Sequence, residues 1–298
     1  MDRVALLRAI AEGGVAGSAL AARFGVSRAA VWKAVQALRA EGLGSEGTAG
    51  EGYRLVDGAG FGPVSLAHAL NREVVFFDRC GSTNTEARRL LLDDPDGSHL
   101  VVADAQDAGK GRLGRPGESH PGENLMFSLV RRPAVAPQRA ATCVLAWAAA
   151  MAEVLDCKVK WPNDLVTLQG KKLGGILAEL QAEAESVRCV ILGVGINVNQ
   201  RTFDGLPQAT SMALETGTPH SRGELLGRLV QAIESVPTAG GPSLDAWRAR
   251  SHTLGQRVRV GDVTGTAHAI RDDGALLIDD TPVLAGDVEL LASAPGPG

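Results

Sequence analysis

The sequence has few aromatic residues and few cysteines. Phe, Trp and Tyr together make up 4% of the 298 residues, so alanine and aliphatic side chains must fill most of the core. The four cysteines are far apart, and they form no CxxC pair and no Cys/His spacing of the kind that binds zinc. Because each lies in an apolar stretch, we expect four buried free thiols and no metal site built from protein side chains.

Three familiar sequence signals are also missing. The chain has no N-terminal secretion signal and no long uninterrupted apolar stretch, which favours a cytoplasmic location and no membrane partner. It also lacks the GxxxxGK[ST] motif of P-loop nucleotide-binding proteins. With 45% hydrophobic residues, a chain of this length is expected to form two or three domains.

Positive charge is scarce as well, and it is unevenly distributed. The formal net charge is −4, which argues against a protein that coats nucleic acid through charge alone. The first 57 residues carry seven Lys or Arg and six Asp or Glu, whereas the remaining 241 carry 23 and 28. Any contact with DNA should therefore lie near the N-terminus and depend on specific docking.

Residues 1–57 have the pattern of a winged helix-turn-helix. Apolar residues at helical spacing predict one helix before Gly13, a second from Ser18 and a third after Ser27, which is a favourable N-cap. A glycine-rich turn and the alternating segment 53–55 then predict the hairpin that forms the wing.

The third helix is the expected DNA-reading element. Residues 20–39 carry four basic side chains and no acidic one. The candidate DNA-contacting residues are Ser27, Arg28, Lys33 and Gln36. A three-helix protein-interaction module is the alternative, and Glu51 at the tip of the wing is unfavourable for a phosphate contact.

A glycine-rich basic segment, Gly109–Arg115, is the strongest candidate for a ligand-binding loop. Its sequence GKGRLGR interleaves three glycines with three basic residues. Glycine lets a backbone approach a ligand closely, and main-chain N–H groups beside fixed positive charges bind phosphate or carboxylate groups. Taken alone, the same composition also fits a mobile surface loop.

Polar and glycine residues also follow or interrupt several predicted strands. The segment 81–86 connects a strand to a helix, and Thr83 with Glu86 predicts a capping box. Lys160 comes at a strand end before a Pro-Asn-Asp turn, and two later strands contain the sequences KLGGIL and GVGIN. Because ligand sites form where such strand ends converge, we expect these segments to lie together.

These segments occur in the order found in one enzyme family. The matching segments are Ser82-Thr83-Asn84, Gln106 ahead of GKGRLGR, KWPNDL at 160–165, KLGGIL at 172–177 and GVGIN at 193–197. Together they resemble the biotin–protein ligases. With a helix-turn-helix in front, the chain resembles the bifunctional family whose members are both biotin–[biotin carboxyl carrier protein] ligase and biotin operon repressor.

The resemblance implies that biotin and ATP form biotinyl-5′-AMP, with Mg²⁺ accompanying the triphosphate, and that biotin then passes to a lysine of biotin carboxyl carrier protein. Lysine and arginine would position two anions and stabilise the charge that develops on the α-phosphate. The implied catalytic residues are Lys110, Arg112 and Lys160. The implied biotin-binding residues are Ser82, Thr83, Asn84, Gln106, Lys110, Gly111, Arg112 and Lys160. The implied ATP-binding residues are Gly109, Arg115, Asn163, Lys172, Gly195 and Asn197.

The resemblance also implies partners. These are the carrier protein, the DNA of the biotin operon, and a second copy of the chain in a homodimer that the adenylate promotes. The chain departs from the family in having no tryptophan shortly after Arg115, where an aromatic ring usually packs against the adenylate. Three alternatives stay open: a ligase with a vestigial DNA-binding domain, a non-catalytic biotin-responsive repressor, and a lipoate-type acyl ligase.

The C-terminal segment 252–292 alternates apolar and polar residues between glycine and aspartate turns. This pattern predicts a small barrel of five or six strands, which the resemblance makes SH3-like. The expected fold class is α+β, with a winged helix-turn-helix, a central mixed-sheet biotin/lipoate ligase-like catalytic domain and an SH3-like C-terminal barrel. The expected ranges are 1–60, 61–250 and 251–292, followed by a disordered tail at 293–298.

Overall fold

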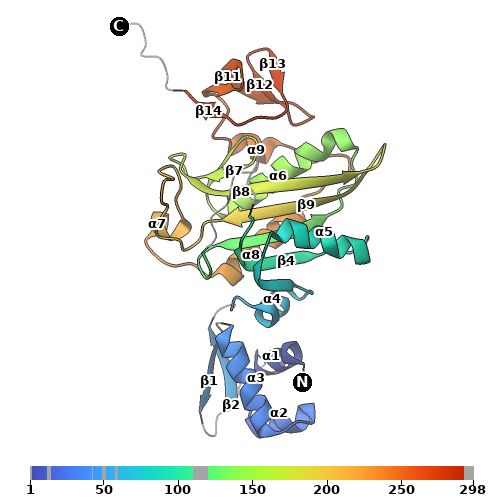
Figure 1. The fold of residues 1–298 in the computed structure, drawn as a ribbon, viewed down its shortest axis with the longest axis vertical. Coiled ribbons are helices and arrows are strands. Elements are labelled where there is room, and N and C mark those ends of the chain that lie inside the picture. The colour runs from blue at the N-terminus through green and yellow to red at the C-terminus, as the bar shows by residue number, and fades with distance from the viewer. Residues whose placement is uncertain are drawn as a thin grey trace. The chain divides into compact units, whose positions relative to one another are not determined.

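The computed structural model describes residues 2–11, 15–41, 43–48, 52–57, 60–109 and 120–291 (Figure 1). The chain divides into two compact units, one formed by Met1–Phe76 with His220–Arg228 and the other by Phe77–Pro219 with Leu229–Gly298. No helix within the described ranges is long and apolar enough to cross a membrane.

The first unit begins with the predicted helix-turn-helix. Its helices are α1 (Arg3–Ala11), α2 (Gly17–Phe24) and α3 (Arg28–Ala40). Gly25 ends α2 in a left-handed conformation with φ of 62°, and the Ser27 hydroxyl accepts a hydrogen bond of 3.1 Å from the main chain in the first turn of α3. The apolar faces of the helices share one buried cluster, which includes Leu6, Leu7, Ile10, Leu20, Val31, Val35 and Leu38.

A two-stranded antiparallel hairpin follows, with β1 at Gly44–Thr48 and β2 at Gly52–Asp57. This hairpin is the predicted wing, and its tip with Glu51 lies outside the described residues. Gly52 has φ of 79°, and a Cβ there would lie 2.4 Å from the carbonyl carbon of Val15. A side chain at this position would therefore separate the wing from the segment that precedes α2.

Helix α4 (Pro63–Leu70) completes the described N-terminal part of this unit. A carboxylate oxygen of Glu41 accepts hydrogen bonds from the N–H groups of Val64 at 3.1 Å and Ser65 at 3.2 Å. The negative charge of Glu41 thus satisfies the free N–H groups at the start of α4.

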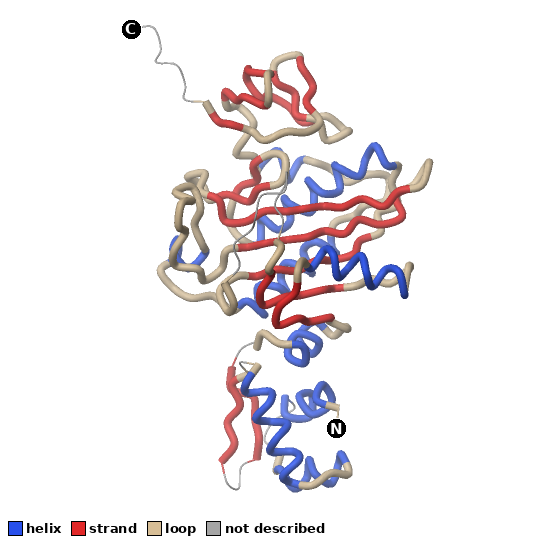
Figure 2. Tube along the Cα trace, viewed as in Figure 1, coloured by secondary structure: helices blue, strands red, loops and turns tan. Residues whose placement is uncertain are grey.

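The second unit is built on a seven-stranded sheet with the order β3-β4-β5-β9-β8-β7-β6 (Figure 2). The strands are β3 (Val75–Cys80), β4 (Leu100–Gln106), β5 (Leu125–Arg131), β6 (Lys158–Lys160), β7 (Asp164–Val166), β8 (Lys172–Ala182) and β9 (Val187–Ile196). Every pair from β4 to β6 is antiparallel. Strands β5 and β9 are almost wholly buried, as their continuous apolar sequences predict.

Helices accompany this sheet. Helix α5 (Thr83–Asp93) connects β3 to β4, and α6 (Ala140–Val154) follows the short 3₁₀ turn η2 (Pro137–Arg139). Helix α6 packs on β6, β8 and β9, and it is apolar on nearly every side, so most of its side chains are buried. The remaining helices are α7 (Met212–Thr216), α8 (Arg222–Ser235) and α9 (Asp245–Ala249).

The C-terminal strands form a second, five-stranded antiparallel sheet with the order β13-β12-β11-β10-β14. The strands are β10 (Arg257–Val260), β11 (Val263–Ile270), β12 (Leu276–Ile278), β13 (Thr281–Val283) and β14 (Glu289–Leu290). In the part of the chain that the structure describes, β13 and β14 are the outer strands, so closure into an SH3-like barrel stays a prediction. The tail at 293–298 lies outside the described residues.

Candidate active site

Three of the sequence motifs meet in one row across the large sheet. Lys160 of β6 lies opposite Asp164 of β7. Asp164 lies opposite Gly175 of β8, which in turn lies opposite Gly195 of β9. Residues directly opposite one another in neighbouring strands project from the same face of a sheet. The predicted convergence of KWPNDL, KLGGIL and GVGIN is therefore present in the fold.

Lys160 is half-buried at the end of β6, and its main chain is firmly held. The next residue, Trp161, is 2% exposed and precedes Pro162 through a cis peptide bond. The Trp161 N–H donates to Oγ1 of Thr253 at 2.9 Å, and its indole N–H donates to the carbonyl oxygen of Gly274 at 3.1 Å. These bonds fix the strand end from which the Lys160 side chain projects.

His252 lies beside the same strand. The main-chain N–H of His252 donates to the carbonyl oxygen of Val159 at 2.8 Å. Burial, followed by the charges of Lys158 and Lys160, lowers the pKa of His252 below its ordinary value of 6.5. The imidazole is therefore neutral at neutral pH and adds no positive charge next to Lys160.

Asp164 forms an ion pair with Lys172, with 2.6 Å between Oδ1 and Nζ. The two side chains are 25% and 48% exposed, respectively. Because water screens such a pair, it contributes at most about 1 kcal/mol to stability, and a phosphate can replace the carboxylate as the partner of Lys172. Asp164 lies within KWPNDL, but the motif alone predicted no role for it.

The two glycines of the row leave the sheet open beside these charges. A Cβ at Gly195 would meet no described atom within 4 Å, and a Cβ at Gly175 would come no closer than 3.6 Å to Asp164. Gly174, in contrast, is packed so tightly that a Cβ would lie 2.5 Å from the carbonyl oxygen of Gly195. A ligand can therefore approach the backbone at Gly195, whereas Gly174 serves the packing of β8 against β9.

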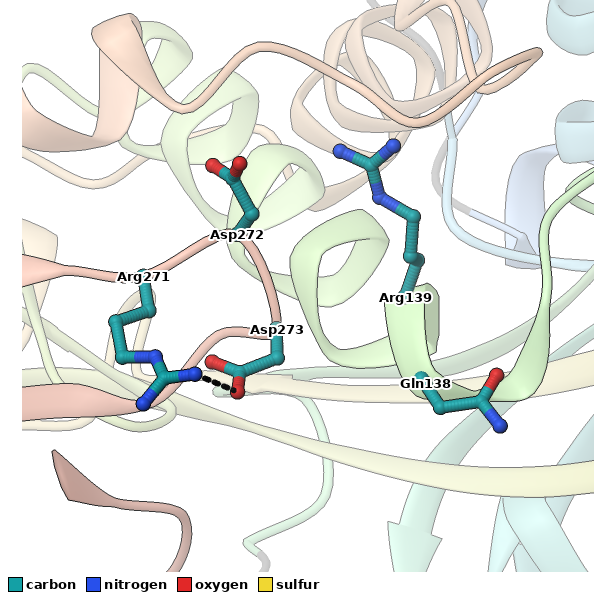
Figure 3. Close-up of a pocket in the computed structure, with 5 residues that line it drawn as sticks. All are labelled: Gln138, Arg139, Arg271, Asp272 and Asp273. Carbon is teal, nitrogen blue, oxygen red and sulfur yellow. Dashed lines mark ion pairs between the residues drawn. The ribbon is translucent and has the colours of Figure 1, made fainter.

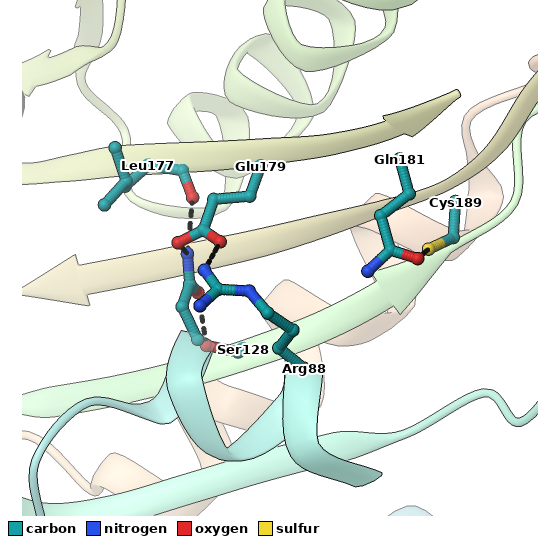
Figure 4. A network of polar contacts seen from close by, with 7 residues as sticks. Arg88, Ser128, Leu177, Glu179, Gln181 and Cys189 are labelled. Carbon is teal, nitrogen blue, oxygen red and sulfur yellow. Dashed lines mark hydrogen bonds and ion pairs between the residues drawn. The ribbon is translucent and has the colours of Figure 1, made fainter. Parts of the chain in front are cut away.

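A buried polar network lies at Gly193, two residues before Gly195 on β9 (Figure 4). Gly193 lies between Ser128 of β5 and Leu177 of β8 in the register. Ser128 is fully buried, and its hydroxyl oxygen lies 2.7 Å from Oγ1 of Thr83 and 2.6 Å from Oδ1 of Asn84. A Cβ at Gly193 would lie 2.3 Å from that same Oδ1, so the network requires glycine at this position.

The amide of Asn84 continues the network toward a charged pair. Its Nδ2 donates to the carbonyl oxygen of Leu177 at 3.2 Å and to Oε1 of Glu179 at 3.0 Å. Arg88 forms an ion pair with Glu179 (Figure 4). The guanidinium group thereby holds the carboxylate that orients Asn84.

The hydrogen-bond directions follow from the donors available. The Oδ1 atom of Asn84 can only accept, and a hydroxyl carries a single hydrogen. When Ser128 donates that hydrogen to Asn84, the hydroxyl of Thr83 donates to Ser128 and keeps only lone pairs for another partner. Thr83 would then accept an N–H group from a ligand.

The predicted capping box at Thr83 is wrong. The N-cap of α5 is Ser82, whose side chain forms no capping hydrogen bond, and Thr83 is the first helical residue. The Thr83 hydroxyl is engaged by Ser128 instead. Oε1 of Gln106 accepts the N–H of Thr83 at 2.7 Å and so satisfies the helix start. The fold thus brings Ser82, Thr83, Asn84 and Gln106 together, and their contacts with biotin stay a prediction.

The glycine-rich loop starts beside this helix. The N–H of Asp107 donates to the carbonyl oxygen of Cys80 at 3.0 Å, and the N–H of Ala108 donates to that of Gly81 at 2.9 Å. Gly109, the first residue of this loop, is the last one described before position 120. The predicted residues Lys110, Gly111, Arg112 and Arg115 lie outside the described residues.

Two predicted ATP-binding asparagines brace the main chain near the row. The Nδ2 atom of Asn163 donates to the carbonyl oxygen of Ile176 at 2.8 Å. The Nδ2 atom of Asn197 donates to that of Thr210 at 2.9 Å. Both amide nitrogens hold loops in place, and the contribution of these residues to ATP binding stays a prediction.

The expectation of four buried free thiols is confirmed. Burial raises the pKa of Cys80 and of Cys143 to about 11 and that of Cys157 to about 12. These thiols are protonated at neutral pH, so they are not activated nucleophiles. Within the described ranges, no group of three or more His, Cys, Asp or Glu side chains is arranged to hold a metal ion.

A cavity of about 700 Å³ lies elsewhere in the second unit (Figure 3). Its lining residues are Gln138, Arg139, Arg271, Asp272 and Asp273. Arg271 pairs with Asp273 at 3.4 Å, and two arginines beside two aspartates give the cavity no net charge. It contains none of the predicted site residues.

In the first unit, the candidate DNA-contacting side chains lie on α3. Arg28 and Lys33 are exposed, Gln36 is half-buried, and Ser27 is occupied as the N-cap. Trp32, for which the sequence predicted no role, is 58% exposed on the same helix. Its place between Val31 and Lys33, outside the Val31, Val35 and Leu38 face that packs in the core, could have marked it.

Comparison with known proteins agrees with this organisation. Residues 76–197 match the biotin/lipoate A/B protein ligase family, and residues 4–54 match an HTH domain. The chain is 32% identical over 305 residues to the bifunctional ligase/repressor BirA of Bacillus subtilis, covering 93% of this chain and 94% of that protein. It is 35% identical over 249 residues to the biotin–[acetyl-CoA-carboxylase] ligase of Mycobacterium tuberculosis, covering 73% and 88%, respectively.

A solved structure extends the likeness to three dimensions. The biotin protein ligase from Aquifex aeolicus in complex with biotin and ATP matches with a TM-score of 0.59 at 26% identity, covering 74% of this chain and 99% of that chain. The helix-turn-helix, the central sheet and the order of motifs all agree with the sequence likeness to BirA. The chain therefore belongs to the family of bifunctional biotin ligase/repressor proteins of the BirA type.

Proposed function

We propose that this protein is an ATP-dependent biotin–protein ligase that forms biotinyl-5′-AMP and transfers biotin to a lysine of biotin carboxyl carrier protein. The observation that carries the proposal is the row formed by Lys160, Asp164, Gly175 and Gly195, where open glycine backbone lies beside lysine side chains. The similarity to BirA over 93% of the chain supports the same activity.

The first step joins two anions. A carboxylate oxygen of biotin attacks the α-phosphorus of ATP, and the bond from that phosphorus to the pyrophosphate oxygen breaks. Lys160, together with Lys110 and Arg112 of the loop, would hold the reacting groups and stabilise the charge on the α-phosphate. In the second step, the carrier lysine amine attacks the acyl carbon, AMP leaves, and the amine loses a proton.

The ring of biotin would lie at the start of α5. Its ureido group offers N–H donors and one carbonyl acceptor. Thr83, with lone pairs left for a ligand, suits an N–H of that group, and Ser82, Asn84 and Gln106 adjoin it. The remaining biotin-binding residues would be Lys110, Gly111, Arg112 and Lys160.

The nucleotide would lie along the open row. Gly195 admits a close approach of the backbone, and Lys172 exchanges Asp164 for a phosphate. The other nucleotide-binding residues would be Gly109, Arg115, Asn163 and Asn197. Mg²⁺ would neutralise the triphosphate, and the carboxylate of Asp164 suits this oxygen-binding ion, which proteins hold mainly through phosphates and water.

A direct assay tests the ligase. The full chain is incubated with biotin, Mg²⁺-ATP and a biotin carboxyl carrier domain, and the carrier is analysed by mass spectrometry. We expect a mass increase equal to one biotinyl group, which depends on ATP and is lost when the carrier lysine is replaced. If the carrier gains no biotinyl group, or if lipoate modifies as much of the carrier as biotin does, the assignment is refuted.

The helix-turn-helix extends the proposal to gene regulation. The N-terminal 57 residues carry a net charge of only +1, so a single copy should bind DNA weakly. Two copies related by a two-fold axis would place both α3 helices in the major groove of a palindromic site in the biotin operon. Adenylate formed in the second unit would favour this homodimer.

We therefore expect DNA binding to depend on the ligase substrates. With biotin and ATP present, affinity for the upstream region of biotin-synthesis genes should rise by about tenfold or more, because coupling between two sites typically has this size. Fluorescence anisotropy measures the affinity, and sedimentation at the same protein concentration measures the oligomer. Equal affinity and an unchanged oligomer in both conditions would leave the helix-turn-helix without this regulatory role.

The proposal includes the domain ranges. The winged helix-turn-helix would occupy residues 1–60, the catalytic domain 61–250 and an SH3-like domain 251–292. The five antiparallel C-terminal strands support the last of these. All four cysteines are free thiols, which supports a reducing, cytoplasmic location.

A further inference from the structure

One tryptophan differs from the other three in its surroundings. Trp147, Trp161 and Trp247 are at most 2% exposed, whereas Trp32 is 58% exposed. Single exposed apolar side chains are common on protein surfaces, so the meaning of Trp32 depends on the helix that carries it and on the side chains around it.

The helix around Trp32 has two distinct sides. Val31, Val35 and Leu38 are buried in the cluster of the helix-turn-helix. The exposed side carries Arg28, Ala29, Trp32 and Lys33, with Gln36 half-buried one turn further. Because residues three and four apart are neighbours on a helix, Ala29 and Trp32 form an apolar strip bordered by basic and amide side chains.

The charges around the strip favour nucleic acid over a protein partner. Arg28 and Lys33 border Trp32, and the segment 20–39 carries no acidic residue. A phosphate backbone matches this arrangement on both sides of the helix, and the major groove of DNA admits one α-helix. The apolar strip would then face the floor of the groove.

The base that Trp32 can recognise follows from its chemistry. Indole carries one N–H donor, no acceptor and a large apolar surface. Adenine and cytosine present an amino donor in the major groove, which indole cannot satisfy, and guanine presents two acceptors but no apolar group. Thymine presents a methyl group beside an acceptor oxygen and so matches both the apolar surface and the N–H of indole. We propose that Trp32 reads a thymine in each half-site by packing against its methyl group, with Ala29 extending the contact.

This inference rests on the proposed repressor function, and the experiment separates the two. The full chain with biotin, ATP and Mg²⁺ is used to select duplexes from a randomised DNA pool. Each thymine of the selected duplex is then replaced by deoxyuridine, which removes only the methyl group. Affinities are measured for the unaltered protein and for Trp32→Ala and Trp32→Phe.

For the unaltered protein, we expect one thymine per half-site whose methyl group contributes about fourfold to affinity, the effect of burying one such group. Trp32→Ala should weaken binding of the selected duplex by about tenfold or more and abolish the sensitivity to that methyl group. Trp32→Phe should retain part of the sensitivity. Leu92→Ala, at a leucine that is 79% exposed in the second unit, is the matched control and should bind normally.

The other outcomes are equally definite. If no sequence is enriched, both the repressor function and this inference fail. If a site is enriched but Trp32→Ala keeps the same affinity and the same methyl dependence, only the inference fails. Quenching of tryptophan fluorescence by iodide gives a second measurement, because iodide in solution can reach Trp32 but not the three buried tryptophans. DNA should shield that fluorescence, and undiminished quenching in the complex would overturn the proposal.

Discussion

Replacing Lys160 by alanine is expected to lower the rate of biotinyl-5′-AMP formation by about 10² to 10³, the effect of removing one group that stabilises transition-state charge. Lys160 stands at the end of β6, in the row that contains Gly175 and Gly195. Its neighbour His252 is neutral at neutral pH and cannot replace the missing charge. Biotin-dependent exchange of pyrophosphate into ATP measures the step.

The control for this variant is Lys158→Ala. Lys158 lies two residues earlier on the same strand, so it faces the same side and carries the same charge further from the row. Its replacement should change the exchange rate only slightly, and thermal unfolding of both variants shows whether the fold persists. A Lys160→Ala protein that is folded and exchanges pyrophosphate within a few-fold of the unaltered rate would rule out the proposed role.

The second large effect is expected from Gly193→Ala, compared with Gly195→Ala in the same motif. The added methyl group at Gly193 would collide with the amide of Asn84 at 2.3 Å and push it away from Ser128. Overpacking of this kind destabilises a protein by about 1–3 kcal/mol, and we also expect a large loss of biotin affinity because Thr83 is displaced.

Gly195→Ala should behave in the opposite way. The methyl group would enter open space, so the unfolding free energy should stay within about 0.5 kcal/mol of the unaltered value. The KM for ATP should instead rise by about tenfold, since a displacement of about 1 Å can cost up to a hundredfold. Chemical denaturation and steady-state kinetics of adenylation provide the two measurements.

Ser128→Ala tests the hydrogen bonds of the polar network without adding any atom to the core. Ser128→Ala removes the hydroxyl that joins Thr83 to Asn84 and leaves the buried Oδ1 of Asn84 without that donor, at a cost of about 1–3 kcal/mol. It should raise the KM for biotin and leave the KM for ATP unchanged. If Gly193→Ala and Gly195→Ala raise the KM of the same substrate by the same factor, the assignment of biotin to the polar network and of ATP to the row is wrong.

Local signals were sufficient for much of the fold. Gly25 and Ser27 end one helix and begin the next through conformations and hydrogen bonds confined to neighbouring residues. The strands β5 and β9 are continuous apolar sequences, so their burial was predictable as well. The order of motifs identified the family and hence the segments that converge, although their register was visible only in the fold.

Contacts between distant residues were not predictable in the same way. Gln106 satisfies the start of α5 although 23 positions separate it from Thr83, and the sequence suggested a local capping box instead. Ser128 looks like a single polar interruption of an apolar strand until the register places it opposite Gly193. Asp164 pairs with Lys172 across β7 and β8, where a register irregularity after Leu165 places Lys172 opposite Val166, and the sequence gives no sign of this irregularity.

The four native cysteines are expected to react slowly with thiol reagents because all of them are buried. Cys80, Cys143 and Cys157 are protonated and shielded in the native state, and Cys189 is also buried with a raised pKa. A disulfide reagent therefore reacts at a rate set by transient opening of the structure. A single cysteine introduced on the surface would be labelled alone, so fluorophores can be attached to this protein without first removing any of its own cysteines.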